Sequence, residues 1–323
     1  MSGAEGGPAA ALGLHHVTTV SGRPQTNLGF NRRALGLKLV KRTVNHDEPE
    51  HHHFYYGDAI GAPGSLLTAF AGDGLAAGRP GAGQATLTEF EAPLGALDFW
   101  ERRLPGFGAR LVARETRFGE ERIVFTDPEG LLLAVTAVAP PPPGAAGAPG
   151  AEIGPEHALR GLRGATIALR DDAPMAALLE ALGYAARGEE PFGRGALRRF
   201  ECAAAPRAGT IDLHVDPAAP DGAEGAGTAH HLAFRAADRA AQDEMAARLA
   251  ALGVAHTAPI DREYFWAVYA RTPSGVLVEI ATDGPGFAVD EPAERLGESL
   301  RIPAGLAARA EEIRAGLPPA RFD

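Results

Sequence analysis

The sequence repeats one short pattern four times, and this repetition constrains the fold more than any other feature. Four predicted helices end in the related motifs ALGL (34–37), LPGF (104–107), ALGY (181–184) and ALGV (251–254). The glycines of these motifs recur at intervals of 70, 77 and 70 residues. A glycine directly after a helical pattern is typical of a left-handed C-terminal cap, so each motif marks the end of one helix in a repeated unit.

Strand-like runs surround each predicted helix. A short run precedes each helix, at 14–20, 85–90, 165–169 and 230–234. A glycine 22 to 28 residues after the motif glycine opens a further strand-like run, at 64, 130, 209 and 275. In the second and fourth units a proline stands two residues before this glycine, which is typical of a tight hairpin turn. Every unit therefore predicts a strand, a helix and then two or three strands.

These units divide the chain into four βαβββ modules. We place the modules at 12–72, 83–139, 161–216 and 228–282. A Pro/Gly linker over 140–160 separates the second module from the third, and an extension over 283–323 contains a predicted helix at 304–315. A period near 70 residues is too long for a solenoid repeat. The prediction is an α+β fold in which the modules pair into two half-open, barrel-like sheets.

Composition excludes several classes of function. The net charge is −10 and no long basic block occurs, so we expect no nucleic-acid partner. No apolar run reaches the ~18 residues that a membrane-spanning helix needs, and the first residues lack the basic start of a secretory leader. Cys202 is the single cysteine, which excludes an intramolecular disulfide and a cysteine-rich metal site. We expect a cytoplasmic protein without a membrane partner. The sequence leaves open whether the chain forms a homo-oligomer.

Two histidine pairs occupy matching places in the first and fourth modules. His15 and His16 lie in the first strand of module 1, and His230 and His231 lie in the first strand of module 4. Because side chains alternate between the faces of a strand, the two members of a pair should point to opposite faces. The register of His230 also contains apolar residues at 232 and 234 and should pack under the helix. His231 should therefore face a cavity, and His16 is its counterpart.

A carboxylate in the last module strengthens this interpretation. The fourth residues after the strand-opening glycines are Thr68, Ala134, Leu213 and Glu279. Glu279 stands inside an apolar strand, where a carboxylate costs several kcal/mol unless it is paired or bound to a metal. Since the other three copies have no carboxylate at this place, Glu279 is the most informative single residue of the chain.

Two imidazoles and one carboxylate form the ligand set known as the 2-His-1-carboxylate facial triad. This set leaves three metal positions open and suits non-haem Fe(II), with Mn(II) as the near competitor. The sequence therefore predicts a metal site of His16, His231 and Glu279. A shared metal requires module 1 to pair with module 4, and modules 2 and 3 should then form a second half-barrel without a metal site.

The remaining histidines carry a weaker expectation. The run of three at 51–53 precedes the strand FYYGD, and we expect it to be solvated polarity at a strand edge. The histidines at 46, 157, 214 and 256 are expected to be structural or exposed.

Several longer motifs resemble the vicinal oxygen chelate superfamily, and most closely its branch of ring-cleaving dioxygenases that act on hydroquinones. The resemblance covers roughly residues 12–303. It rests on LHHVT (14–18), LVKRTVNHDEP (39–49), FYYGDAIGAPGSLLTAF (54–70), TRFGE (116–120), EHALRGL (156–162), DREYFWAVYARTPSGVLVEIATDGPGF (261–287) and DEPAERLGESLRIP (290–303). The resemblance implies metal ligands at the second histidine of each pair and at the glutamate, which are His16, His231 and Glu279.

The same resemblance implies further residues around the metal. They are His15, Thr18, His230, Arg262 and Tyr269, all of the expected residue type. Tyr269 or Arg262 can hydrogen-bond a substrate oxygen, and a histidine or Tyr269 can relay protons. The sequence departs from the family pattern at Arg163, where an aromatic residue or histidine is expected.

We therefore expect an Fe(II)-dependent, extradiol-type ring-cleaving dioxygenase whose partners are a small aromatic substrate, of hydroquinone or catechol type, and O₂. Two alternatives stay open. A glyoxalase-type isomerase or lyase of the same superfamily would generally use four protein ligands, and the fourth would fall near Thr68, which is no carboxylate. A non-catalytic binding protein of this fold would have no need of a metal triad.

Overall fold

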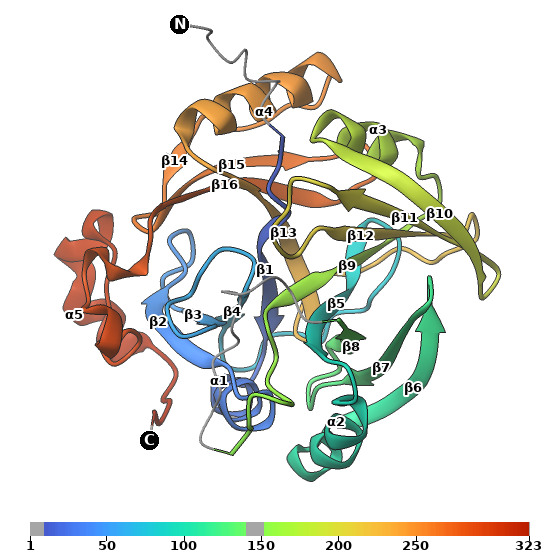
Figure 1. Cartoon of the computed structure of the whole chain (residues 1–323). Helices are drawn as coiled ribbons and strands as arrows, with labels where there is room; N and C mark the ends of the chain where they lie inside the picture. Colours follow the sequence, from blue (N-terminus) through green and yellow to red (C-terminus); the bar gives the residue numbers. More distant parts are fainter. Residues whose placement is uncertain (1–9, 140–151, 323) are drawn as a thin grey trace, which may run out of the picture.

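Two curled sheets of eight strands each form the body of the molecule. The computed structural model describes residues 10–139 and 152–322. The first sheet has the strand order β14-β15-β16-β13-β1-β4-β3-β2, and the second has the order β10-β11-β12-β9-β5-β8-β7-β6. Figure 1 shows the sheets as two half-barrels side by side, with the helices on their outer faces.

The first sheet is built from the first and last modules. Module 1 contributes β1 (Leu14–Ser21), α1 (Pro24–Gly29), a π-helical turn (Phe30–Ala34), β2 (Lys38–Val44), β3 (His52–Gly57) and β4 (Leu66–Ala71). Module 4 contributes β13 (Thr228–Ala236), α4 (Arg239–Ala251), β14 (Ile260–Asp261), β15 (Phe265–Arg271) and β16 (Leu277–Pro285). β1 and β13 run antiparallel at the centre of the sheet. The predicted pairing of module 1 with module 4 is confirmed.

The second sheet is built from the two middle modules. Module 2 contributes β5 (Gln84–Pro93), α2 (Leu97–Arg103), a 3₁₀ turn (Leu104–Phe107), β6 (Arg110–Arg117), β7 (Glu120–Thr126) and β8 (Leu132–Val138). Module 3 contributes β9 (Leu162–Leu169), α3 (Ala173–Ala181), β10 (Tyr184–Phe192), β11 (Gly195–Cys202) and β12 (Thr210–Val215). Residues 140–151 of the predicted linker lie outside the described residues.

The two faces of each sheet have different surroundings. The helix-covered faces share one large apolar core, to which Leu14, Phe90, Leu232 and Phe234 contribute. The inner face of the first sheet carries a smaller apolar cluster, which includes Tyr55 of β3, Phe265 of β15 and the nearby Tyr264 and Phe287. Strand alternation therefore separates a packing face from a face that is free to build a site.

The C-terminal extension lies along the outer edge of the first sheet. A parallel bridge joins Arg42 of β2 to Leu300, and the fully buried ammonium of Lys41 contacts the carboxylates of Asp290 and Glu291. Short 3₁₀ turns lie at Phe287–Val289, Ala293–Arg295 and Ala304–Arg309, and α5 spans Ala310–Gly316. The predicted helix at 304–315 thus begins as 3₁₀ and becomes α-helical only at its second half. Within the described residues, no helix has the length and apolarity that crossing a membrane requires.

Candidate metal centre

Three buried side chains meet on the inner face of the first sheet. His16 comes from β1, His231 from β13 and Glu279 from β16, which are three neighbouring strands. Their exposed fractions are 1%, 5% and 1%. The distance from His231 Nε2 to Glu279 Oε2 is 2.9 Å, that from His16 Nε2 to the same oxygen is 3.4 Å, and that between the two imidazole nitrogens is 3.3 Å. The fold therefore brings together three residues that lie far apart in the sequence.

These three separations match the spacing of ligands around one metal ion. Two ligands that bind an ion at ~2.1 Å and at right angles lie ~3.0 Å apart, close to all three observed distances. The carboxylate oxygens of Glu279 are near the imidazoles, but neither oxygen meets the angular requirement of a hydrogen bond to any described residue. Three potential ligand atoms so close to one another, on buried side chains, are expected of a ligand set. Among the described residues, this is the cluster of three that could hold a metal.

The charges of the cluster are strongly coupled. Burial on its own would raise the pKa of Glu279, but the facing imidazoles of His16 and His231 hold this pKa far below its ordinary value. Burial lowers the pKa of His231, against the opposing effect of Glu279. The carboxylate is thus an anion and the imidazole has a free lone pair, which are the states in which these side chains bind metals.

Two β-bulges bring both histidines of each pair into contact with each other beside the cluster. The pairing of β1 with β13 shifts by one residue at His15 and again at His230. A bulge interrupts the alternation of side chains, so the expectation that the two members of a pair point to opposite faces is wrong. His15 Nδ1 lies 3.0 Å from His16 Nδ1, and His230 Nδ1 lies 2.7 Å from His231 Nδ1. Each candidate ligand therefore contacts its neighbour through the ring nitrogen that does not face Glu279.

His15 and His230 stay neutral in these contacts. Burial, and then the nearby His16, lowers the pKa of His15 well below its ordinary value. Burial, followed by the nearby His231, lowers the pKa of His230 to about 4. His15 also lines a second cavity of about 300 Å³, which the ring of Phe265 separates from the cluster.

Arg262 and Tyr269 stand together beside the cluster. Tyr269 pairs directly with Glu279 across β15 and β16. Arg262 donates from Nε to the Tyr269 hydroxyl at 3.2 Å and from Nη2 to Asp47 Oδ2 at 3.0 Å. Burial and the charge of Glu279 raise the pKa of Tyr269, so its hydroxyl keeps its proton. Asp47 belongs to the loop after β2, and its ion pair with Arg262 joins module 1 to module 4.

A small cavity of about 30 Å³ lies over the cluster. It is lined by His16, Asn45, His46, Asp47, His53, Tyr55, Phe70, His231, Arg262, Phe265, Tyr269 and Glu279. Of the further residues that the resemblance implies, Arg262 and Tyr269 line this cavity, whereas His15 and His230 do not, and neither does Thr18. It is fully buried in β1 and its hydroxyl lies 2.8 Å from that of Thr68 on β4. Thr68 carries a hydroxyl that is hydrogen-bonded to Thr18, so it does not supply the carboxylate that a fourth metal ligand at this place would need.

The expectation that the histidines at 51–53 are solvated is wrong for two of them. His52 and His53 are 4% and 6% exposed because β3 is an internal strand between β2 and β4. His53 lines the cavity, and so does His46, whose Nε2 is buried without a partner in the described part of the chain. Burial lowers the pKa of His46 to about 4. The signal for His53 was present in the sequence, since it shares a register with Tyr55 and not with the apolar Phe54.

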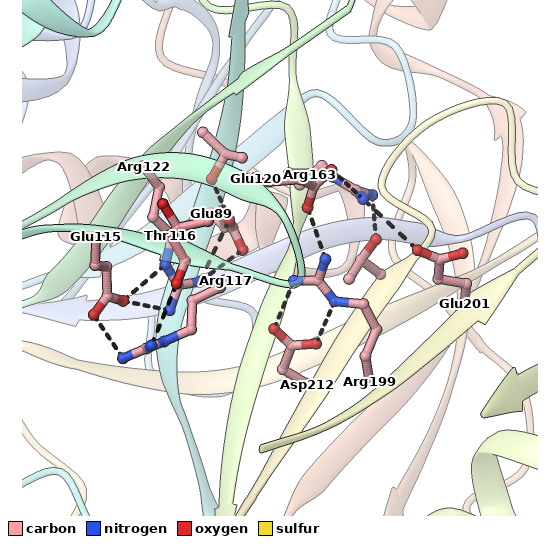
Figure 2. A network of polar contacts seen from close by, with 12 residues as sticks. Glu89, Glu115, Thr116, Arg117, Glu120, Arg122, Arg163, Arg199, Glu201 and Asp212 are labelled. Carbon is pink, nitrogen blue, oxygen red and sulfur yellow. Dashed lines mark hydrogen bonds and ion pairs between the residues drawn. The ribbon is translucent and has the colours of Figure 1, made fainter. Parts of the chain in front are cut away.

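The inner face of the second sheet carries ion pairs where the first sheet carries the cluster of His16, His231 and Glu279. The strand registers place Gly164, Leu87 and Ala134 at the positions of His16, His231 and Glu279. Figure 2 shows the network that fills this region. Arg199 binds Asp212 through two hydrogen bonds of 2.8 and 2.9 Å, and Arg122 lies between Glu89 and Glu115.

Asp212 corrects one detail of the repeat. The register places Asp212, and not Leu213, at the position of Thr68. The left-handed turn residue before the strand is Gly64 in module 1 but Ala208 in module 3, with φ of 85° and 53°. Counting from Gly209 was therefore wrong by one residue. The middle modules do hold a carboxylate at a matching place, but Arg199 neutralises it. Arg163, the departure from the family pattern, occupies the bulge position of His15 and joins this network through Glu120.

Comparison with known proteins gives the family. The protein-family model described as "Glyoxalase/Bleomycin resistance protein/Dioxygenase superfamily" matches residues 93–280 of the chain. The chain belongs to this superfamily, and the resemblance seen in its motifs is confirmed. It is 39% identical over 310 residues to a Bacillus subtilis (strain 168) protein named "Putative ring-cleaving dioxygenase MhqO", which covers 95% of this chain and 96% of the relative. It is 30% identical over 315 residues to the chlorohydroquinone/hydroquinone 1,2-dioxygenase of Sphingobium indicum, with coverage of 95% and 96%.

Solved structures agree with this assignment. The crystal structure of a "putative dioxygenase" from Bacillus subtilis matches this chain with a TM-score of 0.91 and 37% identity. The match covers 97% of this chain and 99% of that chain. Glyoxalase I from Zea mays matches with a TM-score of 0.62 at 12% identity, over 84% of this chain and 92% of that chain. The first match confirms the predicted vicinal oxygen chelate architecture, and the second match shows a common fold alone.

Proposed function

We propose that this protein is a metal-dependent ring-cleaving dioxygenase that inserts both atoms of O₂ into a dihydroxylated aromatic ring. The observation that carries the proposal is the buried cluster of His16, His231 and Glu279 under an aromatic-walled cavity. The names of the relatives support ring cleavage, and the name of the Sphingobium relative supports a hydroquinone over a catechol as the first substrate to test.

His16, His231 and Glu279 would hold the metal, with Fe(II) preferred and Mn(II) as the alternative. When bound there, such an ion lowers the pKa of a substrate hydroxyl and offers open positions at which the ring and O₂ can meet. A set of three ligands, without a carboxylate as a fourth, favours ring cleavage with O₂ over the chemistry of the glyoxalase-type isomerases.

His15 and His230 would orient the two ligand imidazoles. The Nδ1–H of a ligand histidine needs an acceptor that fixes its tautomer and leaves Nε2 free for the metal. The neutral imidazoles of His15 and His230 supply such acceptors at 3.0 and 2.7 Å. We assign both residues this positioning role, in addition to the proton relay expected from the resemblance.

Arg262 and Tyr269 would hold the substrate. The protonated Tyr269 hydroxyl accepts a hydrogen bond from Arg262 and keeps its own proton to donate to a ring oxygen. The guanidinium of Arg262 adds a positive charge beside a ring that becomes anionic on binding. The negative charge on the ring oxygen strengthens the hydrogen bond that this oxygen accepts. The aromatic rings of Tyr55, Phe70 and Phe265 exclude water from the same cavity.

Oxygen uptake tests the proposal. Protein loaded anaerobically with Fe(II) is mixed with a substituted hydroquinone or a catechol, and O₂ consumption and the ultraviolet absorbance of the opened product are recorded. We expect one O₂ per ring, with the hydroquinone turned over faster. Metal binding at one equivalent without O₂ uptake from either ring would refute the dioxygenase and favour isomerase or lyase chemistry. If the protein binds no metal and consumes no O₂, the result favours a non-catalytic binding protein of this fold.

A further inference from the structure

We propose that His53 is a further catalytic residue, which donates a hydrogen bond from Nδ1 to an oxygen of the bound aromatic ring. The inference rests on the function proposed above and names a residue for which the sequence motifs imply no role. Its evidence is the place of His53 in the cavity, the way its ring is fixed, and the state of its two ring nitrogens.

The ring of His53 is part of the cavity wall and is held rigidly there. β3 carries His53 and Tyr55 on the same face, and both line the cavity with the metal cluster. The His53 ring lies with its centre 4.1 Å from that of Tyr55 and 4.4 Å from that of Phe70. Aromatic rings on both sides fix the plane of the imidazole, so its nitrogens point in set directions.

A chain of hydroxyl groups occupies one of these nitrogens. His53 Nε2 lies 3.1 Å from Thr68 Oγ1, which in turn lies 2.8 Å from Thr18 Oγ1. No hydrogen bond to His53 Nδ1 occurs among residues 10–139 and 152–322. Nδ1 is therefore the nitrogen that is left for a ligand. The chain also gives Thr18 a role at a distance, since it acts on the cavity through Thr68 and His53.

The charge state of His53 decides what Nδ1 can do. Burial first, and then the neighbouring His46, His16 and His231, hold the pKa of His53 well below its ordinary value, so the ring is neutral at pH 7. A neutral imidazole has one N–H and one lone pair. When the Thr68 hydroxyl donates to Nε2, the proton resides on Nδ1 and can be donated to a ring oxygen. No proton is transferred in this step and no buried charge is created, which keeps its cost low.

The neighbouring histidine is a matched control. His52 lies on the same strand, is 4% exposed and also has Nε2 engaged, by the carbonyl oxygen of Pro318 at 2.8 Å. Its ring stacks on Phe54 with a centre-to-centre distance of 4.8 Å, on the opposite face of the sheet from the cavity. The two histidines thus share burial, strand and aromatic packing, and differ in facing the cavity.

The experiment measures ring binding separately from turnover. Metal-loaded wild type, His53→Phe and His52→Phe are titrated anaerobically with 4-nitrocatechol, whose visible spectrum reports both binding and ionisation, after metal content and Tm have been recorded. Phenylalanine keeps the aromatic packing and removes both nitrogens. We expect His53→Phe to keep one metal and to bind the ring about tenfold or more weakly, as the loss of a hydrogen bond to an anionic oxygen requires. His52→Phe should stay within about twofold of wild type.

Equal affinities in the two variants, or an unchanged affinity in His53→Phe, overturn the proposal. Where His53→Phe loses its metal or does not fold, Thr68→Val decides. This variant keeps the size of the side chain and removes the hydroxyl that fixes Nε2, and an unchanged ring affinity would again overturn the proposal. Oxygen uptake is recorded in parallel. Wild type that binds the ring but consumes no O₂ refutes the dioxygenase, whereas the comparison of His53 with His52 still stands on ring binding alone.

Discussion

Replacing Glu279 by glutamine removes a buried negative charge while it keeps the size of the side chain. The carboxylate oxygen lies 2.9 Å from His231 Nε2 and 3.4 Å from His16 Nε2, with Glu279 1% exposed. Loss of one charged member of such a buried set costs about 3–5 kcal/mol. We therefore expect the affinity for Fe(II) or Mn(II) to fall by about two to three and a half powers of ten.

The effect is measured as stabilisation by metal. At a metal concentration 100 times its Kd, the wild type should gain about 2.7 kcal/mol in free energy of unfolding. At the same concentration, Glu279→Gln should gain at most about 0.4 kcal/mol if its affinity falls by about two powers of ten, the smaller of the two limits. Anaerobic urea unfolding with and without Mn(II) gives both quantities. Mn(II) is the convenient probe because it resists oxidation better than Fe(II) does.

A second buried carboxylate provides the control. Asp212 is also 1% exposed, but it is paired with Arg199 in the other sheet. Asp212→Asn should lower the free energy of unfolding by about 3–5 kcal/mol and leave the gain from metal unchanged. If Glu279→Gln is stabilised by metal as strongly as the wild type, the cluster is not the metal site and the reasoning fails.

Three further predictions concern pH, the C-terminal extension and substrate binding. His46 has a pKa of about 4 in the folded protein against 6.5 when exposed, so its contribution to the free energy of unfolding is complete above pH 6.5 and is lost as pH falls toward 4. Urea unfolding of the metal-free protein at pH 7 and pH 5 should show a smaller loss of this free energy in His46→Gln than in the wild type, and an equal loss contradicts the prediction. Lys41→Met removes the buried cation that pairs with Asp290 and Glu291 and should cost about 3–5 kcal/mol, with faster proteolysis after residue 286; unchanged stability and cleavage would show that the ion pair does not anchor the extension. Tyr269→Phe removes the acceptor of the Arg262 Nε–H, so kcat/KM should fall about 10–100-fold at constant metal content, and a fall in metal content instead would assign Tyr269 a structural role.

Much of the fold could be predicted because local signals repeat in it. The glycine after each helix and the strands around it identify four modules, and the shared ligand set then requires module 1 to lie beside module 4. One count failed at Ala208, because a non-glycine residue occupies the left-handed position that glycine fills in the other modules. The boundary of a strand therefore depends on backbone conformation, which residue type indicates only on average.

The candidate cluster was within reach of the sequence, but its surroundings were not. A carboxylate inside an apolar strand and two matching histidines identify the three central residues. The bulges at His15 and His230 could not be predicted, since alternation is the only rule that a strand pattern supplies. The register that His53 shares with Tyr55 is visible in the sequence, but its burial follows only from the sheet order, which makes β3 an internal strand.

The order of the modules has a consequence for how the chain reaches its folded state. His16 precedes the whole second sheet, and His231 and Glu279 follow it. During synthesis, the middle modules can pair as soon as β12 is complete, whereas β1 waits for β13. Formation of the β5–β9 pair brings the ends of modules 1 and 4 close together, and this shortens the loop whose closure opposes the first sheet. The half-barrel of modules 2 and 3 is thus the scaffold on which the other half-barrel assembles, and a chain that stops within module 4 contains a complete second sheet but only part of the candidate metal centre.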